Sequence, residues 1–90
     1  MPNSSFSLRI VTPERVFFEG PVVSIIAPGT SGYLGVLIDH APLVTTVGKG
    51  KFTFRTEEGR IQRLKIDGGF LEVLDNEARL LTDSVESLNV

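Results

Sequence analysis

The sequence predicts an all-β domain, folded as a β-sandwich or flattened barrel, and three observations support this. Near the start, the apolar residues Phe6, Leu8 and Ile10 alternate with Ser7 and Arg9, the period of two expected for a half-buried strand. Short segments rich in β-branched residues then recur along the chain, separated by glycine-containing turns. No window has a convincing helical pattern, and residues 84–90 are too few for a stable helix alone.

Glycine and proline positions divide the chain into short expected strands. The expected strands cover residues 6–10, 16–18, 22–27, 43–47, 52–54, 60–66, 70–74 and 78–81. We expect the chain to turn at Gly20-Pro21, 48–50, 57–59 and 75–76, and to form a glycine-rich loop from Pro28 to Gly35. Gly68-Gly69 predicts a bulge or a close approach of two backbones.

Composition limits the possible functions. Ninety residues form one small domain, and the absence of cysteine excludes disulfides, thiolate metal sites and a thiol nucleophile. The net charge of −2 argues against a protein built chiefly to bind nucleic acid or anionic lipid. No apolar run approaches the ~20 residues that span a bilayer, and no secretory leader is evident. We therefore expect a reducing compartment, with any membrane association made through a partner.

Charge is unevenly distributed along the chain. The middle third is basic and the segment from Asp67 onward is acidic, with Arg79 as its lone cation. The basic residues of the middle third are Lys49, Lys51, Arg55, Arg60, Arg63 and Lys65. Two interpretations remain open: strands of opposite charge pair across a sheet, or the surface is polarised and orients a partner.

The residues that could carry chemistry do not form a convincing catalytic or metal site. His40 is the only histidine and follows Asp39, but it precedes Ala41-Pro42, where the extended chain favours a surface imidazole. One histidine without cysteine is too few for a typical zinc site. The glycines of the 28–35 loop match neither a dinucleotide fingerprint nor a P-loop. We expect no catalytic, cofactor-binding or metal-binding residues.

A nucleic-acid interface is also considered, because basic residues interleave with Phe52 and Phe54. On a strand these two rings share one face, opposite to Lys51 and Arg55. Such a pattern is typical of a core face backed by a solvated face, so the segment predicts core packing rather than a stacking platform.

Four motifs, taken in order, resemble the N-terminal β-sandwich domain of the epsilon subunit of rotary F-type ATP synthases. They are Leu8-x-Ile10-Val11-Thr12-Pro13-Glu14, Gly32-Tyr33-Leu34-Gly35-Val36, His40-Ala41-Pro42-Leu43-Val44-Thr45 and Gly68-Gly69-Phe70-Leu71-Glu72-Val73. Each motif alone is weak, but the ordered set covers nearly the whole chain. The resemblance implies a ten-stranded sandwich of two five-stranded sheets over residues 1–84, followed by a short tail at 85–90.

The resemblance also implies a function without catalysis. The family's domain lies at the foot of the central stalk, where it binds the gamma subunit and the polar loops of the membrane c-ring and helps couple proton translocation to ATP synthesis. By position, Thr12 and Tyr33 would contact the c-ring, and His40, Ala41, Pro42 and Thr45 would contact gamma. The implied location is peripheral, on the cytoplasmic face of an energy-transducing membrane such as the bacterial plasma membrane.

This chain departs from the family pattern in three places. Ile38-Asp39 replaces a common Pro-Gly before the His-Ala-Pro-Leu motif, which changes the turn and adds a carboxylate beside His40. Tyr33 stands where members often carry an acidic residue. The chain stops at Val90, where members usually continue into two helices, so we expect no helical inhibitory switch and no regulatory ATP site.

The main alternative to a rotor subunit is a stand-alone β-sandwich module that binds peptide or nucleic acid, and a more remote one is a small hydrolase that uses His40. A rotor subunit should bind gamma stoichiometrically and ignore nucleic acid. A nucleic-acid binder should instead show a steep salt dependence from phosphate contacts.

Overall fold

The computed structural model describes residues 5–89, and these contain strands and turns but no helix. Residues 1–4 and 90, which the expected domain boundaries include, lie outside the described part. The strands are β1 (Phe6–Val11), β2 (Val16–Gly29), β3 (Gly32–Val36), β4 (Leu43–Thr56), β5 (Ile61–Leu74), β6 (Glu77–Leu81) and β7 (Val85–Ser87). The predicted all-β class is confirmed.

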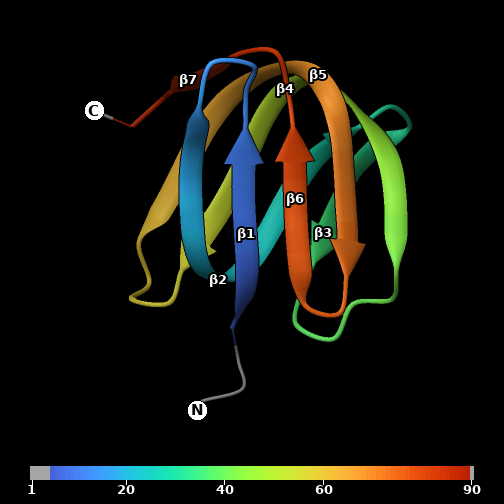
Figure 1. The fold of residues 1–90 in the computed structure, drawn as a ribbon, viewed down its shortest axis with the longest axis vertical. Coiled ribbons are helices and arrows are strands. Elements are labelled where there is room, and N and C mark those ends of the chain that lie inside the picture. The colour runs from blue at the N-terminus through green and yellow to red at the C-terminus, as the bar shows by residue number, and fades with distance from the viewer. Residues whose placement is uncertain (1–4, 90) are drawn as a thin grey trace.

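The strands close into a flattened barrel (Figure 1). Around the barrel the strand order is β1, β6, β5, β4 and β2, and the pairing of β2 with β1 closes it. All pairings are antiparallel except β1 with β6. Outside this closed set of five strands, β3 pairs with β2 and β7 pairs with β5. This closure leaves β3 and β7 as edge strands.

Three of the strands are longer than expected. β2, β4 and β5 each contain 14 residues, so the turns expected at Gly20-Pro21 and at 48–50 are wrong, and the chain bends there without leaving the sheet. Glycine permits such bends because it has no Cβ to crowd the concave side. Pro21 is tolerated in β2 because it lies at the bend, where the strand passes from one layer to the other.

The expected count of ten strands is not confirmed, since the described residues form seven. The two-layered sandwich is nevertheless present, because each long strand passes through both layers with one half in each. The first layer contains β1, β6, residues 16–22 of β2, 43–47 of β4 and 69–74 of β5. The second layer contains β3, β7 and the other halves of the long strands.

Two further segments differ from expectation. Of the loop expected from Pro28 to Gly35, only the turn at residues 30–31 lies outside strands, because β3 begins at Gly32. Residues 85–89, expected as part of a tail, extend the second layer: β7 pairs with β5, and the backbone N–H of Leu88 donates to the Arg63 carbonyl at 2.8 Å. Periodicity could not reveal β7, because a three-residue strand is too short to show a period.

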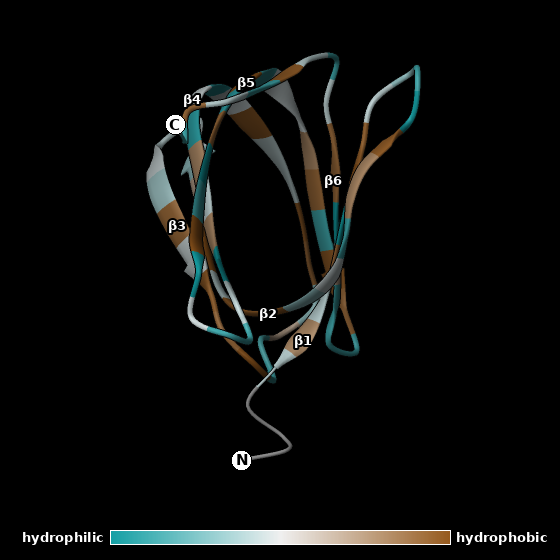
Figure 2. Cartoon of the chain, turned by 90° about the vertical axis from the view of Figure 1, so that its left-hand side faces the viewer, coloured by the Kyte–Doolittle hydropathy of each residue, from teal (hydrophilic) through white to brown (hydrophobic). Residues whose placement is uncertain are grey.

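The core lies between the two layers. Side chains alternate between buried and exposed along β1 and β6, and Figure 2 shows bands of hydrophobic and hydrophilic residues along the strands. Phe52 and Phe54 are 0% and 2% exposed, and the Phe54 ring packs on Phe18 with centroids 4.5 Å apart. The prediction that both aromatics of β4 belong to the core is confirmed, so neither ring is available for stacking on bases.

Candidate protein-binding surfaces

The residues expected to contact partners lie at opposite ends of the sandwich. In the view of Figure 1, the β1–β2 turn, next to Thr12, and the β2–β3 turn, next to Tyr33, lie toward the upper end. The loop of residues 37–42, here called the His40 loop, lies at the lower end. The structure thus brings Thr12 and Tyr33 to one end and keeps them apart from His40, Ala41 and Pro42.

The His40 loop begins with a tight turn. The backbone N–H of His40 donates to the carbonyl oxygen of Leu37 at 3.2 Å, which closes a four-residue turn. Asp39 occupies the left-handed region with φ of 63°. Aspartate is one of the few side chains that tolerate this conformation. The chain therefore keeps a turn here without a glycine.

The backbone N–H and the carboxylate of Asp39 hold this turn in place. The backbone N–H of Asp39 donates to Oδ1 of Asn76 at 2.7 Å, and Nδ2 of Asn76 donates to Oδ1 of Asp39 at 3.0 Å. Asn76 also accepts a hydrogen bond from the Ser7 backbone through its carbonyl oxygen, at 3.0 Å. We call the two Asp39–Asn76 hydrogen bonds the Asp39–Asn76 clamp. It fastens the His40 loop to the β5–β6 turn.

The His40 imidazole is engaged within its own loop. Its Nδ1 lies 2.7 Å from the carbonyl oxygen of Ala41, so this nitrogen must carry the proton and donate. His40 is half-buried. The Asp39 carboxylate bonds Asn76 and not the imidazole, so no acid–base relay forms. Within residues 5–89, no three metal-ligating side chains come together.

The gamma-contact residues expected from sequence do not all face the same way. Ala41 and Pro42 are exposed, whereas Thr45 is half-buried on the same side of β4 as the core residue Val47. The intervening Val44 points outward and is 72% exposed, and Leu74 on the neighbouring strand is 55% exposed. Sequence reasoning missed Val44 and Leu74, because in an apolar pair such as Leu43-Val44 no alternation shows which member faces solvent.

Thr12 lies in a compact hairpin turn. Its backbone exchanges hydrogen bonds with that of Arg15, at 2.9 and 3.3 Å, and its hydroxyl donates to the Arg15 carbonyl oxygen at 3.2 Å. Pro13 and Glu14 form the exposed tip. The Thr12 hydroxyl is thus committed to the turn, and the exposed groups at this point are the side chains of the tip.

Tyr33 presents most of its ring to solvent. Tyr33 is 64% exposed, and its hydroxyl lies near Gly50 of β4. A Cβ built on Gly50 would lie 3.1 Å from the Pro28 ring and 3.9 Å from the Tyr33 hydroxyl. Glycine at this position therefore leaves room for the Pro28 ring, and the Tyr33 hydroxyl lies nearby at the β4 bend.

An apolar row crosses the outer face of the first layer beside Thr12. In register, Phe70 of β5 lies opposite Leu81 of β6, Leu81 opposite Val11 of β1, and Val11 opposite Val16 of β2. Phe70 is 54% exposed, and Leu81 and Val16 are each 41% exposed. A depression of about 350 Å³ borders this row and is also lined by Thr12. The sequence carried no signal for the row, because its members come from four strands.

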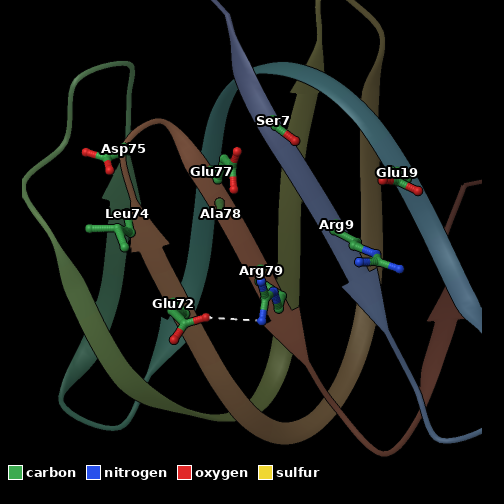
Figure 3. Close-up of a pocket in the computed structure, with 9 residues that line it drawn as sticks. All are labelled: Ser7, Arg9, Glu19, Glu72, Leu74, Asp75, Glu77, Ala78 and Arg79. Carbon is green, nitrogen blue, oxygen red and sulfur yellow. Dashed lines mark ion pairs between the residues drawn. The ribbon is translucent and has the colours of Figure 1, made fainter.

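Beside the apolar row, the same outer face is acidic, and Figure 3 shows the charged residues that gather there. A depression of about 530 Å³ lies here, and its charged lining residues are Arg9, Glu19, Glu72, Asp75, Glu77 and Arg79. Arg79 Nη1 lies 3.5 Å from Glu72 Oε1, a distance expected of a surface ion pair. Four carboxylates against two guanidinium groups leave this face negative.

The comparisons with known proteins agree with the sandwich and its motifs. Residues 5–88 match the family described as ATP synthase, Delta/Epsilon chain, beta-sandwich domain. The chain belongs to this family. The resemblance expected from the ordered motifs is therefore confirmed.

Relatives in the delta/epsilon family cover most of the chain. It is 41% identical over 86 residues to the ATP synthase epsilon chain of Syntrophomonas wolfei, covering 96% of this chain and 63% of the relative. It is 45% identical over 83 residues to that of Moorella thermoacetica, covering 92% and 62%. The epsilon chain of Chlorobaculum tepidum is 42% identical over 83 residues, covering 92% and 94%. The chain thus spans less than two thirds of the first two relatives and nearly all of the third.

Solved structures share the delta/epsilon fold. A chain of the Euglena gracilis mitochondrial ATP synthase (OSCP/F1/c-ring) superimposes with a TM-score of 0.89 at 24% identity, covering 94% of this chain and 54% of that one. A chain of the Tetrahymena thermophila enzyme (central stalk/c-ring) gives 0.75 at 16% identity, covering 89% and 64%. At these identities the likeness establishes the fold. Among residues 5–89 there is no helix of the length and apolarity needed to cross a membrane.

Proposed function

We propose that this chain is a non-catalytic rotor subunit of an F-type ATP synthase, part of the central stalk that couples proton translocation to ATP synthesis. The observation that carries the proposal is the family match over residues 5–88 together with relatives named ATP synthase epsilon chain at 41–45% identity. The closed barrel suits a load-bearing part, because a closely packed β core deforms little.

The gamma subunit is proposed to bind at the lower end, at His40, Ala41, Pro42 and Thr45. The support is mechanical: the Asp39–Asn76 clamp and the bond between the His40 ring and the Ala41 carbonyl hold this loop before any partner arrives. A loop that is already ordered loses little conformational entropy on docking. The adjacent exposed side chain of Val44 adds apolar surface to the same site.

The c-ring is proposed to contact the upper end, at Thr12 and Tyr33. Tyr33 offers a large and mostly exposed amphipathic ring, a residue type that is enriched at interface hot spots. Because Tyr33 carries no charge, this contact would depend less on electrostatic attraction than one made by an acidic residue. Opposite ends for gamma and the ring would let one rigid domain link both partners.

The proposed site of action is peripheral, at the cytoplasmic face of an energy-transducing membrane, and membrane attachment would come through the ring. We propose no role for a nucleotide, a metal ion or nucleic acid. Both aromatics that could have stacked on bases are at most 2% exposed, which disfavours the alternative of a nucleic-acid-binding module.

Isothermal titration of the chain into the matching gamma subunit tests the proposal. We expect one-to-one binding, weakened about tenfold by His40→Ala. Glu58→Ala, an exposed residue of the β4–β5 turn, is the matched control and should bind like the wild type. A folded wild-type chain that does not bind gamma would overturn the proposal, whereas equal binding by His40→Ala would remove only that residue from the site.

Tyr33→Ala tests the second contact. We expect it to reduce association with a detergent-solubilised c-ring that carries gamma, while titration against gamma alone is unchanged. Equal loss against both partners would contradict the assignment of the two ends to different partners.

A further inference from the structure

Besides the Lys49–Asp67 ion pair, the outer face of the second layer carries four cations. Lys51 and Arg55 of β4 and Arg63 and Lys65 of β5 are all exposed and alternate with buried core residues. We call these four residues the basic face. β4 and β5 pair in unbroken register, with Lys51 opposite Lys65 and Thr53 opposite Arg63, so these side chains project from one side of the sheet.

The pairing of Lys51 with Lys65 is unfavourable for the isolated domain. Side chains directly opposite in an antiparallel pair have Cβ atoms about 5 Å apart, and like charges at that spacing destabilise the sheet. Among residues 5–89, none of the four cations forms an ion pair within 4.0 Å. Lys49, two residues before Lys51 on β4, does form an ion pair with Asp67, with Nζ 3.7 Å from Oδ1. The repulsion therefore serves no evident purpose within the fold.

The charge segregation seen in the sequence thus becomes a polarised molecule. The outer face of the first layer is acidic, whereas the outer face of the second layer is basic. Two interpretations of the uneven charge were left open. The first, that oppositely charged residues pair across neighbouring strands, accounts for the Lys49–Asp67 and Glu72–Arg79 contacts. The second interpretation, a surface that orients a partner, accounts for the basic face.

The surroundings of the basic face favour a protein partner over a lipid or nucleic acid. Glu57 and Glu58 lie at the β4–β5 turn, and Glu86 lies opposite Lys65 on β7, so exposed carboxylates flank the cations. An extended array of phosphates would meet these carboxylates as well as the cations, and the chain carries a net charge of −2. A partner with only a few carboxylates can place them on Lys51, Arg55 and Arg63, away from Glu86.

The geometry also favours a helix as the binding element. A sheet face is normally covered by a helix, whereas an extended segment adds to a sheet edge. Successive outward residues of a strand are about 6.7 Å apart, close to the about 6 Å between residues four apart on a helix. Ile26 lies beside Thr53 on the same face and is 49% exposed, so an apolar contact is available among the charges.

We infer that the basic face is a docking surface for an acidic α-helix of a partner protein, one that presents carboxylates at four-residue intervals beside an apolar side chain. The inference does not depend on the proposed place in the ATP synthase, because the gamma and c-ring contacts proposed above use other residues. It assigns a role to the opposed lysines that the fold itself does not need.

A pair of peptides tests the inference. The probe is a fluorescein-labelled, alanine-based helical peptide of about 20 residues, with glutamate at every fourth position and leucine beside the row of glutamates. The control peptide has lysine in place of each glutamate. Binding to the whole chain is measured by fluorescence anisotropy at about 50 mM NaCl, where surface charges are weakly screened. We expect the glutamate peptide to bind and the lysine peptide not to bind.

Two double variants with the same net charge localise the site. Lys51→Gln/Lys65→Gln should weaken binding of the glutamate peptide about fivefold, whereas Arg9→Gln/Arg79→Gln, on the opposite layer, should leave it unchanged. Equal weakening by both would show a non-specific charge effect and overturn the inference. Thermal unfolding serves as the fold control: removing the opposed lysines should not lower the midpoint, and a clear fall would mean that the pair serves the fold.

The competing partners are tested with the same chain. Vesicles containing phosphatidylglycerol and a single-stranded oligonucleotide should bind more weakly than the glutamate peptide at about 50 mM NaCl. Tighter binding to the vesicles would assign the basic face to a membrane surface, and tighter binding to the oligonucleotide would assign it to nucleic acid. Either outcome would overturn the inference.

Discussion

The Asp39–Asn76 clamp links the fold to the proposed gamma site, and a double-mutant cycle can measure it. Both residues have positive φ, 63° and 61°, so glycine can replace either without backbone strain. Asn76→Gly removes both hydrogen bonds of the clamp, whereas Asp39→Gly removes only the bond to the carboxylate and keeps the bond from the backbone N–H. The two variants therefore differ by one hydrogen bond.

The expected energies follow from counting these bonds. Each exposed hydrogen bond contributes about 1 kcal/mol to the free energy of unfolding. Asn76→Gly should then cost about 2 kcal/mol and Asp39→Gly about 1 kcal/mol. The double variant should cost about 2 kcal/mol, because the carboxylate has no partner once the amide is removed, and the coupling energy is about 1 kcal/mol.

Urea unfolding followed by circular dichroism measures these energies, and a loss of 1 kcal/mol corresponds to a fall of about 4–8 °C in the thermal midpoint for a domain of this size. Titration against gamma supplies the functional readout, in which Asn76→Gly should weaken binding because the His40 loop is less ordered before docking. Additive losses, with no coupling between the two sites, would refute the argument that the bonds seen in the structure hold this loop.

Three further substitutions test other parts of the structure. Gly69→Ala should lower the free energy of unfolding in urea by about 3 kcal/mol, because the added Cβ would overlap the Leu81 carbonyl. Gly32 has a similar φ but open space around it, so Gly32→Ala should cost only about 1 kcal/mol. Equal losses for the two variants would show that the overlap is not the cause. Phe52→Ala should cost about 4 kcal/mol, and a loss below about 1 kcal/mol would disprove its core role. Val44→Ser should leave stability unchanged yet weaken gamma binding about fivefold; unchanged binding would exclude Val44.

The sequence predicted the class of fold well but the strand ends poorly. The alternation at Phe6, Leu8 and Ile10 marked the buried face of β1, and the turns at 57–59 and 75–76 lie where glycine or paired Asp-Asn allow positive φ. The breaks expected at 20–21 and 48–50 were wrong for a physical reason. A glycine permits a turn and a bend equally, and only the neighbouring strands decide whether the backbone stays in the ladder.

For the candidate site, the sequence singled out the motif around His40, and the structure shows what holds this loop. The amide of Asn76, 37 residues along the chain from Asp39, meets both the N–H and the carboxylate of that residue. No local pattern could indicate this pairing. The exposure of Val44 and the half-burial of Thr45 were likewise missed, because they depend on which side of β4 the core lies.

The sequence by itself determined the all-β class, the family, the lack of a disulfide framework and the uneven charge, because these depend on residue identity and on short-range periodicity. The tertiary structure alone decided that three strands bend through both layers, that the proposed contact residues of the two partners lie at opposite ends, and that the charges separate onto opposite faces. The physical reason is register: the pairing of β4 with β5 sets Lys51 against Lys65, and the order of strands sets Phe70, Leu81 and Val11 in one row. Such neighbours are made by hydrogen-bonded ladders between distant segments, so they exist only once the barrel has closed.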